Sequence, residues 1–98
     1  MSRYQIKIEY DGAQFVGWQY QKNGLSIQEV IQKAIFKFSG EKAKIIGAGR
    51  TDAGVHAIDQ VAHFDLRKKF KKKSFIMGVN QHMCNFPISI TNVIKVNS

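Results

Sequence analysis

Residues 47–57 read GAGRTDAGVHA and form a glycine-rich connection between two apolar runs. Glycine lacks the Cβ atom that opposes positive φ, so such a stretch can turn sharply and let a ligand approach the backbone. Arg50 and Asp52 stand two residues apart, and in an extended segment both side chains point to the same side. The stretch therefore predicts a loop between two strands that presents a cation and a carboxylate to one ligand. The alternative for a lone Asp-x-Gly is a hairpin loop whose aspartate bonds its own backbone.

The apolar runs on either side of this loop predict the second and third strands of a sheet. Residues 43–48 form a short, mainly apolar run that leads into the glycines. Residues 58–66 alternate, and alternation gives a strand two different faces. One face carries Ala62, Phe64 and Leu66, and the other carries Val61, His63 and Asp65.

Alternation also predicts a strand near each end of the chain. The first strand places Tyr4, Ile6, Ile8 and Tyr10 on one apolar face, between polar neighbours. In the last strand, residues 88–96, the apolar face is expected to hold Ile88, Ile90, Ile94 and Val96, with Asn92 interrupting it. Each strand is therefore expected to bury one face only.

Two helices are predicted between the strands. The first, residues 26–39, has Ser26 as N-cap, Glu29 as its capping-box partner and Gly40 as its stop. An apolar stripe follows at helical spacing, made of Ile27, Val30, Ile31, Ala34, Ile35 and Phe38. Residues 70–83 are compatible with a second helix.

The resulting order is strand, helix, strand, strand, helix, strand. This order predicts a ferredoxin-like α+β fold, with a four-stranded antiparallel sheet and both helices on one face. With 98 residues and no linker or internal repeat, residues 1–98 are expected to form a single domain.

Charge and cysteine content narrow the function classes. Fifteen Lys and Arg residues against 7 Asp and Glu give a net charge of +8, which favours a polyanionic partner. Much of the excess lies in one cluster, Arg67, Lys68, Lys69, Lys71, Lys72 and Lys73, which is either a phosphate-binding surface or a solvated one. The single cysteine, Cys84, excludes an internal disulfide and is expected to be a small buried side chain. Without a signal peptide or an apolar run of membrane-spanning length, we expect a soluble cytoplasmic protein.

Nine consecutive residues, Gly49 to Ala57, resemble the signature of the TruA family of tRNA pseudouridine synthases. Two further stretches fit the family in order and spacing: residues 9–12 (EYDG) with 17–19 (GWQ), and residues 78–80 (GVN). Family members are far longer, so the chain resembles only their amino-terminal part. The resemblance agrees with the α+β fold predicted from periodicity.

The resemblance implies that the longer enzyme isomerises uridine at positions thirty-eight to forty in the anticodon arm of tRNA, as a homodimer and without metal or organic cofactor. Asp52 would be the catalytic carboxylate, as nucleophile or as base. Arg50 is suited to fill the space that the target base leaves or to pair with a phosphate. Gly49, Thr51, Gly54 and His56 would complete the substrate site. The resemblance also implies a tyrosine that stacks on the target base, downstream of the part of the family that these 98 residues match.

Other chemistries fit the sequence less well. The histidines and Cys84 have no zinc-ligand spacing, so no metal is predicted. A non-catalytic RNA-binding module of the same topology would need stacking aromatics on its third strand, which residues 60–66 lack. A phosphate-handling hydrolase would need an anion cradle after the first strand, and residues 11–17 contain no Lys or Arg. The aromatic side chains of residues 15–20 either stack on bases or, as we favour, cover one end of the core.

Overall fold

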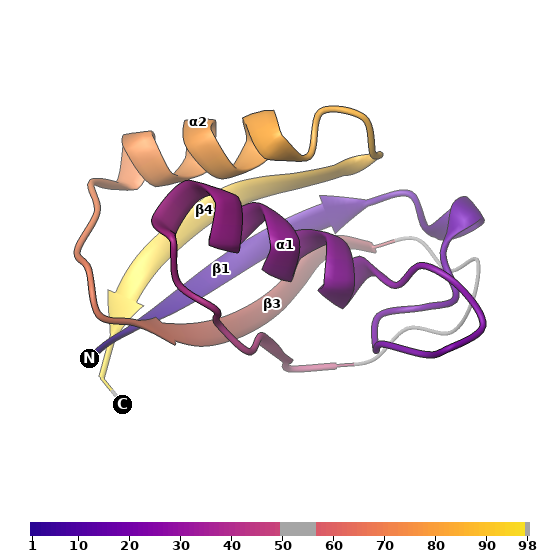
Figure 1. The fold of residues 1–98 in the computed structure, drawn as a ribbon, viewed down its shortest axis with the longest axis horizontal. Coiled ribbons are helices and arrows are strands. Elements are labelled where there is room, and N and C mark those ends of the chain that lie inside the picture. Colours follow the sequence, from indigo (N-terminus) through magenta and orange to yellow (C-terminus); the bar gives the residue numbers. More distant parts are fainter. Residues whose placement is uncertain (50–56, 98) are drawn as a thin grey trace.

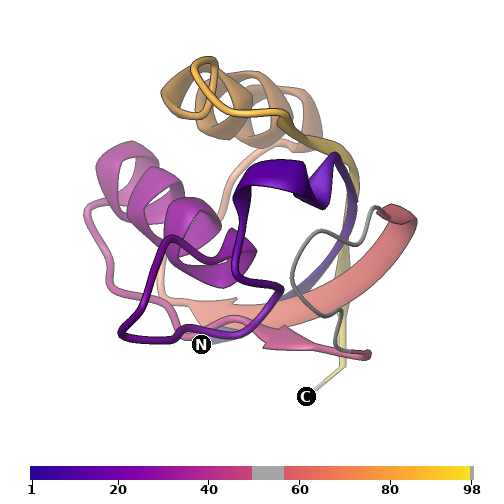
Figure 2. The ribbon, with the colours of Figure 1, turned by 90° about the vertical axis from the view of Figure 1, so that its right-hand side faces the viewer.

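The computed structural model describes residues 1–49 and 57–97. It contains the strands β1 (Ser2–Tyr10), β2 (Ile46–Gly47), β3 (Ala57–Leu66) and β4 (Ile88–Val96), the helices α1 (Ile27–Ser39) and α2 (Lys72–His82), and a short 3-10 helix, η1 (Gly12–Gln14). The sheet order is β2-β3-β1-β4, and every neighbouring pair is antiparallel. Both helices cover one face of the curved sheet (Figures 1 and 2). The predicted ferredoxin-like arrangement is confirmed.

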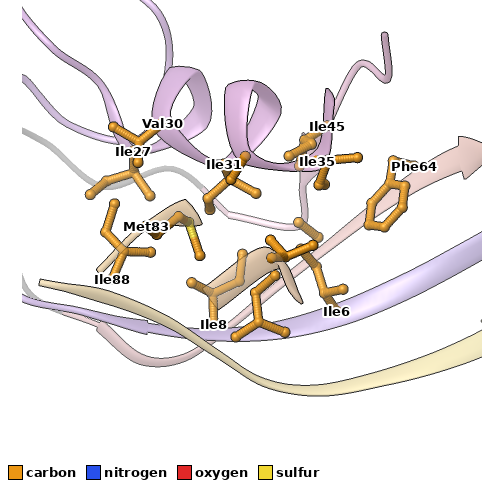
Figure 3. Packing of buried hydrophobic residues seen from close by; sticks show 14 of the residues in the cluster. Ile6, Ile8, Ile27, Val30, Ile31, Ile35, Ile45, Phe64, Met83 and Ile88 are labelled. Atoms are coloured by element: carbon orange, nitrogen blue, oxygen red, sulfur yellow. The ribbon is translucent and has the colours of Figure 1, made fainter. Parts of the chain in front are cut away.

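The core lies between the two helices and the sheet, as the apolar periodicity predicts. In β1 the buried residues are Tyr4, Ile6, Ile8 and Tyr10, each no more than 6% exposed. The α1 side chains of Ile27, Ile31 and Ile35 point down onto this face (Figure 3). Burial of so many branched apolar side chains is the main force that holds helix and sheet together.

Helix α1 begins and ends where its sequence predicts. The Ser26 hydroxyl accepts a hydrogen bond from the Glu29 N–H at 3.1 Å. Gly40 ends the helix with φ of 77°, a left-handed conformation that favours glycine. The Glu29 carboxylate lies 3.3 Å from the Lys33 ammonium, so within the described residues it pairs along the helix and does not close the capping box.

The predicted strand at residues 43–48 is wrong in length, because only Ile46–Gly47 pairs with β3. The reason lies in α1. Its Gln32 side chain accepts a hydrogen bond from the Ile45 N–H at 3.0 Å, and its Gln28 side chain donates one to the Ile45 carbonyl at 2.9 Å. The two glutamines, one helical turn apart, thus satisfy the backbone groups that a strand would present to a neighbour.

The predicted apolar face of β4 is also partly wrong. Ile8 pairs with Ile90 but Lys7 pairs with Asn92, so Thr91 is an extra residue in β4. A one-residue bulge exchanges the two faces of every residue beyond it. Val93 is consequently buried at 5% exposure, whereas Ile94 is 46% exposed.

Three smaller expectations have mixed outcomes. The second helix is Lys72–His82, shorter than the predicted 70–83. Phe15 and Trp18 are buried and cover one end of the core, but Tyr20 is 58% exposed. Cys84 is exposed, contrary to prediction, because α2 has already ended and Met83 is the side chain that points into the core.

Candidate active site and basic surface

The glycine-rich segment is attached to the sheet through its described ends. The Ala48 N–H donates to the Val61 carbonyl at 2.8 Å, and the Gln60 side-chain amide donates to the Gly49 carbonyl. Arg50, Thr51, Asp52, Gly54 and His56 lie outside the described residues. The structure thus describes the two ends of this segment, where it leaves the sheet after Gly47 and rejoins it at Ala57.

Segments far apart in the sequence meet at this end of the sheet. Tyr10, the last residue of β1, pairs with Ala57, the first residue of β3. The Tyr10 ring lies 6.3 Å from the Trp18 ring, centroid to centroid. A Cβ atom on Gly47 would lie only 2.7 Å from the Trp18 Nε1 atom, so this position requires glycine. The EYDG and GWQ stretches thus border the attachment of the GAGRTDAGVHA segment.

Local hydrogen bonds brace this border. The Asp11 carboxylate accepts from the Ala13 N–H at 2.9 Å, which caps η1. The Asp11 N–H donates to the Pro87 carbonyl at 3.0 Å and ties the end of β1 to the start of β4. Gly17 adopts φ of 116°, and its carbonyl accepts from the Ile27 N–H at 3.1 Å. A rigid frame of this kind is what a loop needs in order to hold catalytic groups in place.

The GVN stretch, residues 78–80, lies on α2 and has structural contacts. A Cβ atom on Gly78 would lie 2.3 Å from the Phe38 ring, so glycine allows the two helices to approach closely. The Asn80 amide donates to the Ile90 carbonyl at 3.0 Å and accepts from the Ile90 N–H at 2.7 Å. Asn80 therefore saturates both outward-facing backbone groups of a buried residue on an edge strand.

The lysine-rich cluster lies at the opposite end of the sheet. Arg67, Lys68, Lys69, Lys71, Lys72 and Lys73 are all exposed, in the connection from β3 to α2 and in the first turn of α2. One of them, Lys68, has an internal partner, because its ammonium donates to the Ser39 carbonyl at 3.2 Å. The remaining five cations have no such contact within the described part of the chain.

Glu41 anchors the start of this cluster. Its carboxylate accepts from the Arg67 N–H at 2.7 Å and from the Lys68 N–H at 3.1 Å. These bonds, that of Arg67 first, hold the pKa of Glu41 below its usual range. The connection is thereby fixed against the end of α1.

We expect Glu41→Gln to lower stability near pH 7, because the amide keeps only one acceptor oxygen for the two N–H donors. A carboxyl group whose pKa is depressed by folding stabilises the protein above its unfolded pKa, near 4.5, and this contribution is lost as the pH falls through the folded pKa. The stability difference between wild type and variant should therefore shrink below about pH 4.5. Urea midpoints at pH 7, 5 and 3 test this, with Glu9→Gln as the control for net charge. A difference that stays constant over this range would contradict the role of Glu41.

Two cations that the sequence did not single out join the cluster. The Arg3 guanidinium binds both oxygens of Asp65, at 2.9 and 3.1 Å, and holds the pKa of Asp65 below its usual range. Lys95 extends from β4, next to β1. A pocket of about 440 Å³ is lined by Arg3, Arg67, Lys69 and Lys95. Sequence order hides this grouping, which only the pairing of β1 with β3 and β4 creates.

Residues 1–49 and 57–97 contain no group of three or more His, Cys, Asp or Glu side chains that could hold a metal ion. Within the same residues, neither helix has the length and apolar character needed to cross a bilayer.

Comparison with known proteins shows one consistent relationship. The sequence profile described as tRNA pseudouridine synthase matches residues 6–92. The chain is 50% identical over 97 residues to tRNA pseudouridine synthase A of Ehrlichia ruminantium (strain Gardel), which covers 98% of this chain and 39% of that protein. It is 49% identical over 96 residues to the protein of the same name from Parvibaculum lavamentivorans, again covering 98% and 39%. It is also 50% identical over 96 residues to tRNA pseudouridine synthase A of Wolbachia pipientis wMel, and this match covers 97% of this chain and 39% of that protein. The chain thus spans about two fifths of the length of these curated relatives, at their amino-terminal side.

Proposed function

Because this chain belongs to the tRNA pseudouridine synthase family, we propose that it is the amino-terminal domain of a longer enzyme that converts uridine to pseudouridine in the anticodon arm of tRNA. Its own contribution is the catalytic carboxylate, Asp52. The observation that supports this proposal is that the EYDG and GWQ stretches lie beside the described ends of the GAGRTDAGVHA segment, Gly47 and Ala57. Two of the stretches that resemble the family thus border the points where the third leaves and rejoins the sheet.

The reaction is an isomerisation in which atoms and electrons balance without an external reagent. The bond between C1' and N1 of the nucleotide breaks, the uracil rotates, and a bond forms between C1' and C5. The proton that C5 carried is released to solvent, and N1 gains one. No electron acceptor or donor is required, so the proposal includes no organic cofactor and no metal.

Asp52 acts either by attacking the nucleotide or by removing a proton from it. The target base must leave its stack before a side chain can reach the glycosidic bond. Arg50 is the residue suited to occupy the vacated space or to pair with a neighbouring phosphate, since a planar guanidinium does both. Gly49, Thr51, Gly54 and His56 complete the substrate site in this proposal.

The partners follow from the same proposal. The substrate is tRNA, at positions thirty-eight to forty, and the net charge of +8 supports binding of a polyanion. As the family resemblance implies, the longer enzyme acts in the cytoplasm as a homodimer. The exposed cations of the lysine-rich cluster contact the RNA backbone: Arg67, Lys68, Lys69, Lys71, Lys72 and Lys73.

The open face of the sheet argues against a purely base-stacking RNA-binding module. Modules of that kind stack bases on aromatic side chains of the sheet surface. On the open face of β3, the register places Val61, His63 and Asp65 beside Lys7, Gln5 and Arg3 of β1. None of these residues is a Phe, Tyr or Trp, so the face lacks that stacking platform.

The test compares the 98-residue chain with a fused protein, in which the chain is followed by the remainder of the Ehrlichia ruminantium relative. The assay is tritium release from C5-labelled uridine in a tRNA transcript. We expect the fused protein to release tritium and the chain alone to release none, because catalytic groups that act as a unit lose most of the rate when one is missing. Release by the chain alone would refute the claim that the active site also needs groups from the remainder of the longer enzyme. A folded but inactive fused protein would refute the proposed function.

A further inference from the structure

A side chain of β3 holds the backbone at the point where the glycine-rich segment leaves the sheet. Just beyond the end of β2, the Ala48 N–H donates to the Val61 carbonyl at 2.8 Å. Continuing the antiparallel register of β2 and β3 by one residue places Gly49 opposite Gln60. There the side-chain amide of Gln60 donates to the Gly49 carbonyl. Gln60 thus extends the contact between the two strands by one hydrogen bond, made by a side chain instead of the backbone.

The Gly49 carbonyl is turned back toward β2. A Cβ atom on Gly47 would lie 2.9 Å from the Gly49 carbonyl oxygen and 2.7 Å from the Trp18 Nε1 atom. Both separations are too short for a real side chain, so the backbone of residues 47–49 takes this course only because Gly47 has none. Trp18 is buried, at 3% exposure. Residues 47–49 are therefore packed against a fixed indole and hydrogen-bonded to Gln60.

Gln60 is itself held by the fold. Its backbone pairs with Ile8 of β1, which is fully buried. Its strand, β3, lies between β2 and β1 in the sheet. The Gln60 side chain is half-buried, so it has fewer alternative positions than an exposed glutamine. A donor that is already restricted loses less conformational entropy when it makes a hydrogen bond.

The place of this hydrogen bond in the sequence connects it to the proposed chemistry. Gly49 directly precedes Arg50 and stands three residues before Asp52. A displacement of about 1 Å in a catalytic group can cost roughly a hundredfold in rate. A catalytic group on a connection between strands therefore depends on where the rigid part of the sheet ends and in which direction the backbone leaves it.

We infer that Gln60 is a positioning residue for Asp52, acting through the Gly49 carbonyl on the direction in which the segment leaves the sheet. The inference rests on the proposed function, which makes Asp52 the catalytic carboxylate. Gln60 does not touch the RNA in this role. Loss of its hydrogen bond should consequently lower turnover and leave tRNA affinity unchanged.

The test uses the fused protein with Gln60→Ala and Gln60→Glu. Alanine removes the donor at every pH. Glutamate has the same length, but its carboxylate cannot donate, whereas its protonated carboxyl group can. Its pKa, about 4.3 in a free peptide, should be raised by the facing carbonyl oxygen, so the donor returns as the pH falls. Gln81→Ala and Gln81→Glu are the matched controls, since Gln81 is exposed on α2.

Turnover at saturating tRNA, filter-binding Kd and the urea midpoint are measured at pH 8, 6.5 and 5, each relative to wild type at the same pH. We expect Gln60→Ala to lower kcat by about 10- to 100-fold at every pH, with Kd within about threefold. Gln60→Glu should show a similar loss at pH 8, and its relative kcat should rise at least about fivefold by pH 5. A purely structural role would not produce this rise.

Wild-type turnover in both Gln60 variants would overturn the inference, as would a relative kcat of Gln60→Glu that does not change with pH. A loss of tRNA affinity equal to the loss of turnover would show that Gln60 acts in binding instead. A urea midpoint well below that of the Gln81 controls would assign Gln60 to the stability of the fold. A folded wild-type fused protein that isomerises no uridine would refute the proposed function, independently of Gln60.

Discussion

Asp52→Asn in the fused protein is expected to reduce the rate of uridine isomerisation by a factor of about a thousand or more, while tRNA affinity stays within a few-fold. An amide is nearly the same size as a carboxylate, so the RNA-binding surface is preserved. It cannot take up a proton as a base or attack as an anion, which removes the function of the carboxylate whichever step it performs. A change that lowers turnover without changing binding indicates an interaction made in the transition state.

The measurement is the tritium-release rate at saturating tRNA, run beside a filter-binding titration. Asp59→Asn is the matched control, because Asp59 is an exposed carboxylate near the start of β3 and loses the same charge. We expect this control to retain turnover. Full activity of Asp52→Asn would exclude Asp52 as the catalytic residue, and an equal loss in both variants would point to a charge effect.

Asn80→Ala is expected to lower the free energy of unfolding of the 98-residue chain by about 2–4 kcal/mol. Its side chain makes two hydrogen bonds to the backbone of Ile90, which is 1% exposed, and each buried group left without a partner costs about 1–3 kcal/mol. β4 is an edge strand, so no neighbouring strand is available to replace the lost partner.

Urea unfolding followed by the fluorescence of the buried Trp18 measures this effect. Gln81→Ala is the control, since Gln81 is exposed on the same helix and should change stability by less than about 0.5 kcal/mol. A loss below that limit for Asn80→Ala would mean that the two hydrogen bonds from Asn80 to the Ile90 backbone contribute little to stability. The GVN stretch would then have another role.

The elements with strong local signals were predictable from the sequence. The alternation in β1 and β3 identified their buried faces, and Ser26 and Gly40 marked the ends of α1 through chemistry that is local to each residue. These features depend on neighbours within a few positions, so a single sequence contains the information. The correct order of elements then limited the topology to the ferredoxin-like arrangement.

The predictions were wrong where residues far away in the sequence determine the local structure. Gln28 and Gln32 occupy the backbone of Ile45, and nothing in the run 43–48 reveals that competition. The extra residue Thr91 in β4 becomes visible only when its pairing with β1 is known, and it moves Ile94 to the other face.

In the candidate site, too, the features made by consecutive residues were predictable and those made by distant residues were not. The GAGRTDAGVHA segment stands out because its residues are consecutive. The pocket lined by Arg3, Arg67, Lys69 and Lys95 does not. Arg3 and Lys95 are brought to the lysine-rich cluster only through strand pairing. The EYDG and GWQ stretches were recognised as sequence, but their meeting around Tyr10, Trp18 and Gly47 required the fold.

The most direct test of the central claim is the location of new pseudouridine in a tRNA transcript after incubation with the fused protein. We predict pseudouridine at one or more of positions thirty-eight to forty, and none at these positions with the Asp52→Asn form. A fused protein that unfolds cooperatively and binds tRNA but leaves these uridines unchanged would contradict the account, as would pseudouridine formed equally well without the Asp52 carboxylate.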